Sequence, residues 1–509
     1  MPKSDIIVSI KSSCGDGQMS YKQGEDRNQL TLSPMCLDDF IPAQNICRVI
    51  LAFVNSLDMI ALGFKYSETK GNGRPPYNPA SMLMLYIYGY LNRIRSSRRL
   101  EAETRRNVEV MWLMERLTPD DKTICNFRKD NVKALKKVFR QFSIWCNEQE
   151  LFGRELAAVD GSKFRANANR KSIHTQKGTE KKLAELEKKI SEYMNELEKN
   201  DSAESEMPRA DSERILEVLK NLGEKKDVLL EWLKKIEEND GKEISEVDPD
   251  ARLMHTNGDG RPLDACYNVQ TVVDSKHSLI VDFDVTTCAD DKGALPKMTE
   301  YAKEIMGVQE IVATADRGYY DGEDIAICEE NKTTCLIPKM KSGRSAPNPA
   351  YNQENFMYSK ETDSYECPSG AILPYKRSKK RKSCSGKVQK DTEVKLYYNF
   401  NACKNCPAKE HCTKEKYGRT VTRSAYQDTL DKHTIRMKDD ENKAILKKRK
   451  EIVEHPFGTT KAVWGFKQFL CRGQENTTGE ASLVFLVYNL RRVFNIFKEN
   501  SKNFIEAMA

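Results

Sequence analysis

A highly charged stretch near the middle of the chain, residues 175–245, constrains the fold more than any other part of the sequence. Its apolar residues recur at alternating three- and four-residue steps in two successive segments, which is the spacing of a coiled coil. They are Leu183, Leu186, Ile190, Tyr193 and Leu197, followed by Ile215, Leu219, Leu222, Leu229, Leu233 and Ile236. Asn200-Asp201-Ser202 and Met207-Pro208 interrupt the pattern, so we expect two helices that fold back as an antiparallel hairpin. Such a hairpin predicts an insertion, not a catalytic element.

Short apolar runs on both sides of this hairpin predict a mixed α/β core. Residues 156–160, Leu-Ala-Ala-Val-Asp, have the length of a buried strand, which we expect to end at Asp160-Gly161. Two β-branched runs, a helical segment and a further apolar run that ends at Asp316 follow the hairpin: residues 267–274, 277–285, 293–307 and 310–316. The β-branched runs predict a β-hairpin, and the order strand, strand, helix, strand indicates a mixed sheet with helices.

Helical periodicity dominates both ends of the chain. Residues 31–152 predict an all-helical domain, with Asn78-Pro79 placed to begin one helix and Thr118-Pro119-Asp120 forming a turn before another. Residues 1–30 are polar and aperiodic, which predicts a flexible tail. Residues 426–509 are helical again, and their apolar run 482–494 is expected to pack onto the core.

Composition indicates a protein with large solvated or polyanion-facing surfaces, because 39% of the residues are hydrophobic and 31% are charged. No run approaches the roughly 20 apolar residues of a membrane-spanning helix, and the N-terminus lacks the features of a secretory signal. We therefore expect no membrane partner and a location in the cytoplasm.

The net charge of +7 is too small to indicate nucleic acid by itself. The 15 cysteines are odd in number and scattered, which argues against a disulfide framework.

Four arginines in the expected helical domain are candidates for DNA contacts: Arg93, Arg95, Arg98 and Arg99. Compact helical domains present such side chains to the phosphates of a duplex. An ordinary charged surface of a helical bundle is the alternative, and the spacing alone does not decide between the two.

Three acids could form a site for metal-dependent phosphodiester chemistry. That chemistry uses two magnesium ions about 3.5–4 Å apart, and Mg²⁺ prefers carboxylate oxygens. Asp160 and Asp316 end expected strands, and Glu454 lies on an expected helix. Each has an ordinary alternative: Asp160-Gly161 could be a hairpin turn, Asp316 could cap the helix that begins near Asp321, and Glu454 could be an exposed helical glutamate.

Four cysteines in a polar segment meet the ligand count of structural zinc: Cys367, Cys403, Cys406 and Cys412. His411 is a substitute ligand. Thiolates at such turns can hold together a small insertion that lacks a core of its own. The alternative is a set of reduced cysteines in a loop. The lysine-rich run 376–382 beside them is a further candidate DNA contact.

Four blocks of sequence, in order, resemble bacterial insertion-sequence transposases of the DDE class. Three resemble their catalytic blocks: AVDGSKFRANANR at 158–170, TADRGYYDGEDI at 314–325 and IVEHPFGTTKAVWGFKQFLCRG at 452–473. The segment 73–113, from GRPPYNPASM to EVMWL, resembles the helical domain that precedes the core in one branch of these enzymes. The resemblance covers residues from about 37 to 495.

The resemblance implies an RNase H-like core in which Asp160, Asp316 and Glu454 are catalytic and bind two Mg²⁺ or Mn²⁺ ions. The last block of the family often has tyrosine, arginine, glutamate and lysine at set intervals. Glu454 and Lys461 fit, whereas Lys447 and Lys450 stand at the tyrosine and arginine places, and Glu451 is a substitute for Glu454. On a regular helix Lys450, Glu454 and Lys461 fall near one face, so the two lysines are expected to bind DNA phosphates.

The implied function is cleavage of DNA at the ends of an insertion sequence and transfer of the freed 3′-hydroxyl into target DNA. The implied partners are double-stranded DNA, as terminal inverted repeats and target, and a second copy of the chain. Two alternatives are a transposase-derived DNA-binding protein without catalysis and a metal-dependent nuclease without strand transfer. The expected fold is multidomain. It begins with a tail, 1–30, a helical DNA-binding domain, 31–152, and the first core strand region, 153–174. The coiled-coil hairpin, 175–245, the RNase H-like core, 246–340, and a cysteine-rich insertion with candidate zinc, 341–425, follow, and the Glu454 helix with the C-terminal helices, 426–509, completes the order.

Overall fold

A mixed six-stranded sheet forms the centre of the computed structural model, which describes residues 36–67, 75–202, 209–256, 263–339, 346–381 and 392–497. Its strands are β1 (Leu156–Arg165), β4 (Arg252–Met254), β5 (Asp264–Asp274), β6 (Ile280–Thr286), β7 (Ile311–Thr314) and β8 (Thr333–Leu336). β1 pairs antiparallel with β5 and parallel with β7; β5 also pairs antiparallel with β4 and β6, and β7 pairs parallel with β8. This mixed order is consistent with an RNase H-like core, and it confirms the predicted hairpin of β5 and β6.

The first strand extends beyond the aspartate where it was expected to end. β1 continues to Arg165, and its ladder with β5 pairs Asp160 with Thr271 and Gly161 with Gln270. The prediction of a strand end at Asp160-Gly161, and the alternative of a hairpin turn there, are therefore wrong. Glycine is needed for another reason: a Cβ at position 161 would lie 2.5 Å from Gln270 Nε2.

Helices from both ends of the chain share one hydrophobic core with the sheet. The N-terminal helices are η1 (Leu37–Phe40), α1 (Ile46–Asn55), α2 (Met59–Leu62), α3 (Pro79–Leu91), α4 (Ser97–Arg106), α5 (Val108–Leu113), α6 (Asp121–Asp130) and α7 (Val132–Glu148). Asn78 caps α3 and Asp120 caps α6, as predicted. The ring of Phe283 on β6 lies 5.0 Å from Phe139 of α7 and 5.0 Å from Phe485 of α16 (Gln474–Ile496). The apolar run on α16 is buried, which confirms its predicted packing onto the core.

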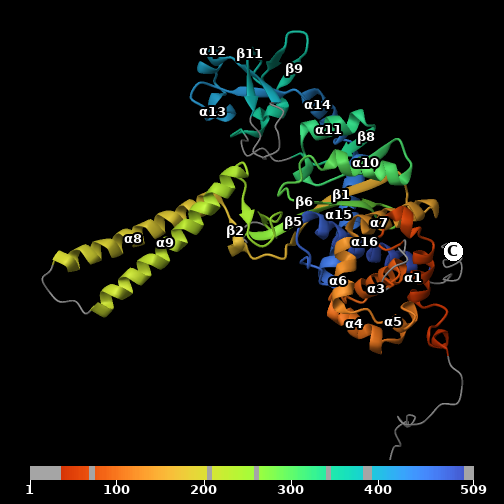
Figure 1. Ribbon diagram of the computed structural model, residues 1–509. Helices are drawn as coiled ribbons and strands as arrows, with labels where there is room; N and C mark the ends of the chain where they lie inside the picture. Colours follow the sequence, from red (N-terminus) through yellow and green to blue (C-terminus); the bar gives the residue numbers. More distant parts are fainter. Residues whose placement is uncertain are drawn as a thin grey trace, which may run out of the picture.

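Helices cover the sheet. α10 (Leu295–Met306) packs against β1, β5 and β6, and α15 (Asp440–Phe457) packs against β1, β5 and β7. In the view of Figure 1, α10 and α11 (Gly322–Glu330) lie above the sheet, whereas α15 and α16 lie below it. The side chain of Asn489 on α16 exchanges two hydrogen bonds with the backbone of Ile280, at 2.9 and 2.7 Å, and so satisfies edge groups of β6.

Two long helices, α8 (Gln176–Ser202) and α9 (Arg209–Glu238), project from the molecule side by side (Figure 1). α8 continues through Ser202, where the sequence suggested a break, and Met207-Pro208 lies outside the described residues. The short strands β2 (Ile173–His174) and β3 (Ile244–Ser245) pair at the base of the hairpin. His174 stacks on Trp232 at 4.5 Å, which ties α9 to this base.

A second, antiparallel sheet lies apart from the first (Figure 1). Its strands are β9 (Met357–Ser359), β10 (Ser364–Glu366), β11 (Ile372–Arg381), β12 (Thr392–Tyr398) and β13 (Thr420–Ser424), with the short helices η4 (Pro349–Tyr351), η5 (Gln353–Asn355), α12 (Phe400–Lys404) and α13 (Lys409–Cys412). α14 (Gln427–Arg436) then leads to α15, which passes into a π-helix, η6 (Gly458–Val463). Among the described residues, no helix is both long and apolar enough to cross a membrane.

Candidate active site

Asp160 lies on β1, and Asp316 lies just past the end of the neighbouring strand β7. The parallel register of β1 and β7 pairs Ala158 with Thr314. The ladder ends at this pair, and Asp316 lies two residues past the end of β7. Its carboxylate is close enough to Asp160 for its charge to raise the pKa of Asp160.

The carboxyl group of Asp160 is buried among charges. Burial raises its pKa to about 6; the nearby Arg449 guanidinium acts to lower it, and the carboxylates of Asp316 and Asp291 act to raise it. Arg449 Nη1 lies 3.7 Å from Asp160 Oδ1. An acid held close to other acids and away from water binds a proton or a cation more readily than an exposed one.

Asp316 is held by the chain that follows it. Its Oδ1 accepts a hydrogen bond of 2.8 Å from the backbone N–H of Gly318, which caps the short 3-10 helix Arg317–Tyr319. The helix α11 is capped by Asp321 instead, so the alternative in which Asp316 caps that helix is wrong.

Asp291 is a third acid near Asp160, and it is not among the acids predicted from the sequence. It lies in the loop between β6 and α10, and its Oδ1 accepts hydrogen bonds from Lys163, Asn268 and Gln270 at 3.1, 2.8 and 2.7 Å. Gln270 also accepts a short hydrogen bond from Tyr319. In the sequence, Asp291 ends the polar run Thr-Cys-Ala-Asp-Asp after the second expected strand. Its spacing from Asp160 and Asp316 gave no reason to predict that it joins them.

Glu454 stands on the exposed side of α15. Its neighbours Ile452 and Val453 are buried, whereas Glu454 is exposed. Arg449 lies on the same helix and reaches Asp160. Glu454 is five residues further along, which on an α-helix is a rotation of about 140° around the helix axis. Glu454 therefore does not face Asp160 as Arg449 does. Lys450 is exposed as well. Arg449, which was not predicted from the sequence, is the basic residue of α15 that lies against Asp160.

Lys461 does not share a face with Lys450 and Glu454, because the helix changes its winding. Pro456 lies inside α15, and the π-helix η6 follows. π-Helical turns are rare and often occur at functional sites. Lys461 Nζ consequently turns onto β1, where it donates hydrogen bonds of 2.6 Å to Ser162 Oγ and 2.6 Å to the carbonyl of Lys163. Burial lowers its pKa to about 8. The expectation of one shared helical face is therefore wrong for Lys461.

The four arginines of the N-terminal helices lie in different environments. Arg98 and Arg99 are exposed on α4. Arg93 is exposed and borders a cavity of about 370 Å³ that Trp464 and other residues also line. Arg95 is engaged internally: its Nη1 lies 2.9 Å from the Gln468 carbonyl and 3.5 Å from the buried carboxylate of Glu480.

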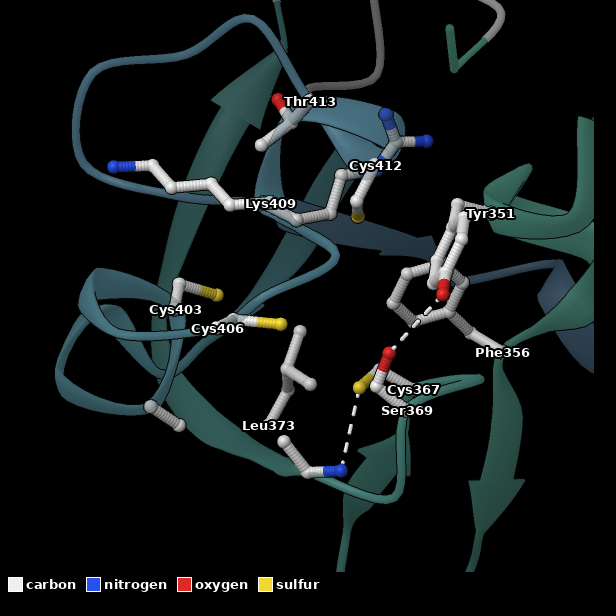
Figure 2. Close-up of a pocket in the computed structure, with 13 residues that line it drawn as sticks. Tyr351, Phe356, Cys367, Ser369, Leu373, Cys403, Cys406, Lys409, Cys412 and Thr413 are labelled. Atoms are coloured by element: carbon white, nitrogen blue, oxygen red, sulfur yellow. Dashed lines mark hydrogen bonds between the residues drawn. The ribbon is translucent and has the colours of Figure 1, made fainter. Parts of the chain in front are cut away.

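The four predicted cysteine ligands face one cavity of about 30 Å³ in the second sheet region, as Figure 2 shows. Cys367 Sγ accepts a 3.3 Å hydrogen bond from the backbone N–H of Ala371. Burial raises the pKa of Cys412, and the other three sulfurs raise it further. Gly418, with φ +123°, packs directly against Cys403, so a side chain there would collide with it. His411 is not among the residues that line the cavity.

Two family models match separate parts of the chain. One, described as a transposase domain (DUF772), matches residues 35–130, and the other, described as a transposase DDE domain, matches residues 366–494. The chain contains a DDE transposase domain. A domain of this kind is a polynucleotidyl transferase and implies DNA transposition, with DNA as the partner.

The DDE transposase domain, as matched, includes the four cysteines, Glu454 and Lys461, whereas Asp160 and Asp316 precede it. The DUF772 match contains all four arginines. No curated protein matched the chain. A solved structure, a piggyBac transposase synaptic complex with hairpin DNA, matches with 9% sequence identity and a TM-score of 0.30 over 91% of this chain and 79% of that chain. A likeness this distant bears on neither the fold nor the function.

DDE transposases generally use divalent metal ions, and the acids near the end of β7 suit such ions chemically. Within the described residues, no group of three or more His, Cys, Asp or Glu side chains is placed so that it could hold an ion by itself. Mg²⁺, however, is commonly bound through one or two carboxylates and completes its shell with water and substrate phosphates. The half-buried, mutually repelling pair Asp160 and Asp316 fits that mode of binding.

Proposed function

We propose that the protein is the transposase of a bacterial insertion sequence, which cleaves DNA at the ends of the element and joins the freed 3′-hydroxyl to target DNA. The observation that carries the proposal is the proximity of Asp160 on β1 to Asp316, two residues past the end of the parallel strand β7, in a chain whose later part matches a DDE transposase domain. The proposed location is the bacterial cytoplasm, where both DNA substrates are found.

Asp160, Asp316 and Glu454 are the proposed ligands of two Mg²⁺ or Mn²⁺ ions. Bound ions of this kind supply charge neutralisation and an activated water for attack on a phosphodiester. Arg449 offsets part of the negative charge of Asp160 at 3.7 Å. Glu454 is exposed on α15 and does not face Asp160, so its role as a ligand requires that a side-chain or helix movement on DNA binding bring its carboxylate to the acids.

Exposed cations on the N-terminal helices and on α15 are the proposed DNA contacts. Arg93, Arg98 and Arg99 would bind phosphates from the N-terminal helices, and Lys450 from α15. Lys461 and Arg95 were also predicted to bind DNA. Lys461 instead donates a hydrogen bond to Ser162 on β1, and Arg95 pairs with Glu480, so we propose that both mainly hold neighbouring segments of the chain in place. A homodimer is proposed for the complex that brings two element ends together.

Cleavage and joining of DNA that carries the terminal repeats flanking the gene tests this function. Wild-type protein is expected to cut these ends with Mg²⁺ and to give a joined product with target DNA. Asp160→Asn, Asp316→Asn and Glu454→Gln should each abolish both products, whereas Asp290→Asn, an exposed acid outside the pair, should not. Undiminished cleavage by one of the first three variants would remove that residue from the site.

The same assay separates the two alternatives. A DNA-binding protein without catalysis would retain end binding in gel shifts and give no cut product with any metal. A nuclease without strand transfer would give nicks and no joined product. The match to a DDE transposase domain favours transposition over both.

We further propose that Cys367, Cys403, Cys406 and Cys412 bind a structural zinc ion. The support is that all four line one cavity, that an N–H donates to Cys367 Sγ and that nearby thiolates would otherwise repel one another. As the described side chains stand, no three of the sulfurs are placed to hold an ion, so zinc would have to draw them together. Metal analysis of purified protein should find zinc, which Cys406→Ser lowers and Cys125→Ser, at an exposed cysteine of α6, does not. Wild-type protein free of zinc would overturn this proposal.

A further inference from the structure

One side of α9 carries large apolar side chains that α8 does not cover. Leu216 and Leu230 are 58% and 44% exposed, on a hairpin that projects from the body of the molecule (Figure 1). Lys226 forms an ion pair of 2.9 Å with Glu187 of α8, so the side of α9 that carries Lys226 faces α8. Apolar residues that gather on another side of the same helix indicate a surface for association.

Leu216, Gly223 and Leu230 form one stripe along α9, the outer stripe. Each lies seven residues after the one before, which is close to two helical turns, so the three share one side of the helix over about 21 Å. Leu222 and Leu229 are half-buried, and each precedes a member of the stripe by one residue. Because one residue turns an α-helix by about 100°, the outer stripe lies beside the contact between α8 and α9 and not within it.

Gly223 lies at the centre of the outer stripe, where the hairpin itself has no need of glycine. A Cβ at this position would meet no described atom within 4 Å. Glycine inside a helix disfavours it relative to alanine, so this residue weakens α9 without a benefit inside the chain. Small residues let the backbones of two helices approach closely. The stripe thus has a flat centre between two exposed leucines, a shape that suits a second helix.

The charges beside the outer stripe match those of a second α9 that runs the opposite way. Lys220 and Asp227 are exposed, and among the described residues neither is in an ion pair. Each follows a member of the stripe by four residues, so both lie on its side away from α8. About a two-fold axis near Gly223, Lys220 of one copy stands opposite Asp227 of a second copy, and Leu216 stands opposite Leu230.

We propose that the outer stripe of α9 binds the outer stripe of a second copy of this chain, with the two helices antiparallel. A parallel pair would set Lys220 beside Lys220 and Asp227 beside Asp227, so charge favours the antiparallel pair. The inference goes beyond the proposed homodimer, because it names the joining surface and its register. The contact forms without DNA and does not depend on the acids near β1 and β7.

Sedimentation equilibrium of the full chain without DNA tests the contact. The wild type should form a dimer, and Leu230→Asp should weaken self-association at least about tenfold, because it sets a charge against Leu216 of the second copy. Val228→Asp is the matched control. Val228 is 52% exposed on the same helix, but it lies five residues from Gly223 and so about 140° away around the axis. This variant should dimerise as the wild type does.

Charge reversal tests the register. Lys220→Asp sets two acids against each other in the antiparallel pair, and Asp227→Lys sets two lysines together, so each should weaken self-association. The double variant exchanges the two charges and should restore it. In a parallel pair each position faces its own copy, and a single reversal replaces one repulsion with another. Single variants that associate as the wild type does, or a double variant without rescue, would overturn the antiparallel register.

Gly223→Ala separates the contact from the stability of the helix. Alanine favours a helix more than glycine does, so the thermal stability measured by circular dichroism should not fall. The added methyl group should nevertheless hold the two helices apart and weaken self-association. Unchanged association in this variant would contradict the close approach at Gly223.

The outcomes separate this inference from the proposed function. A dimer that Leu230→Asp and Val228→Asp weaken equally, or do not weaken, would overturn the contact. A wild-type chain that stays monomeric but cleaves and joins element ends would also overturn it and would leave the proposed function standing. A dimer that Leu230→Asp dissociates, in a chain that cleaves no DNA with any metal, would support the contact and remove the function.

Discussion

The two sheets of this protein bury their faces by different means. The central sheet shares a continuous core with the N-terminal helices and α16, whereas the buried cluster of the second sheet is limited to Phe356, Tyr365, Leu373, Tyr397 and Val421. Apolar contacts throughout the large core stabilise the fold, and this offsets the free-energy cost of a half-buried charge such as Asp160 at its edge.

The small sheet relies on polar links instead. Arg423 lies 3.7 Å from the centre of the Tyr358 ring and forms ion pairs with Asp428 and Asp431. The hydroxyl of Tyr397 donates to Asp363 at 2.6 Å. Small domains with few buried apolar residues commonly need a metal or disulfides for stability. The acids therefore lie beside a large apolar core, whereas the small sheet combines a small apolar cluster with ion pairs and hydrogen bonds.

The largest expected effect tests whether the central core is continuous. Phe283→Ala removes a ring that contacts both Phe139 and Phe485 and should lower the free energy of unfolding by about 3–5 kcal/mol. Urea denaturation followed by circular dichroism and by tryptophan fluorescence should show one coincident transition. Separate transitions for the N-terminal helices and the sheet would show that the two do not share one continuous core.

Asp160→Asn should stabilise the metal-free protein while it abolishes cleavage. The pKa of Asp160 is raised from 3.8 to about 6, so its ionisation disfavours the folded state. That cost is absent below about pH 3.8, grows as the pH rises and is complete above about pH 6. At pH 7 we expect a gain of about 1–3 kcal/mol in the free energy of unfolding. Thermal unfolding at pH 7 and at pH 4 measures it, and an equal gain at both would contradict the electrostatic cause.

Zinc removal should act on the small sheet alone. A strong chelator is expected to make the segment 346–424 sensitive to protease while strands β1 to β8 stay protected, because the two regions have separate buried clusters. Limited proteolysis with mass spectrometry locates the cuts. Equal protection with and without chelator would show that the polar links of the small sheet suffice.

The smallest effect on stability is expected at the surface of the N-terminal helices. Arg98→Ala should change the free energy of unfolding by less than about 0.5 kcal/mol, yet lower the salt dependence of DNA binding by about one unit of slope. Arg95→Ala is the matched contrast, because it leaves Glu480 buried without its cation and should cost stability instead. Denaturation and DNA titration over a range of salt concentrations measure both, and equal stability loss in the two variants would contradict the contrast.

Local spacing in the sequence determined the types and order of the main elements. Alternating three- and four-residue steps predicted α8 and α9, β-branched runs predicted β5 and β6, and Asn78 and Asp120 marked where helices begin. These features follow from the sequence because hydrophobic periodicity and helix caps depend on residues only a few positions apart. The family resemblance added Asp160, Asp316 and Glu454 as a set, which no single residue could indicate.

Tertiary structure alone decided which groups meet at the site. Strand pairing carried β1 past Asp160 and brought Asp291 to the acids, and packing of α15 turned Arg449 toward Asp160. The π-helix turned Lys461 onto β1. Most of these contacts join residues more than a hundred positions apart. They depend on the register of strands and on the rotation of a helix on the sheet, and short-range patterns encode neither.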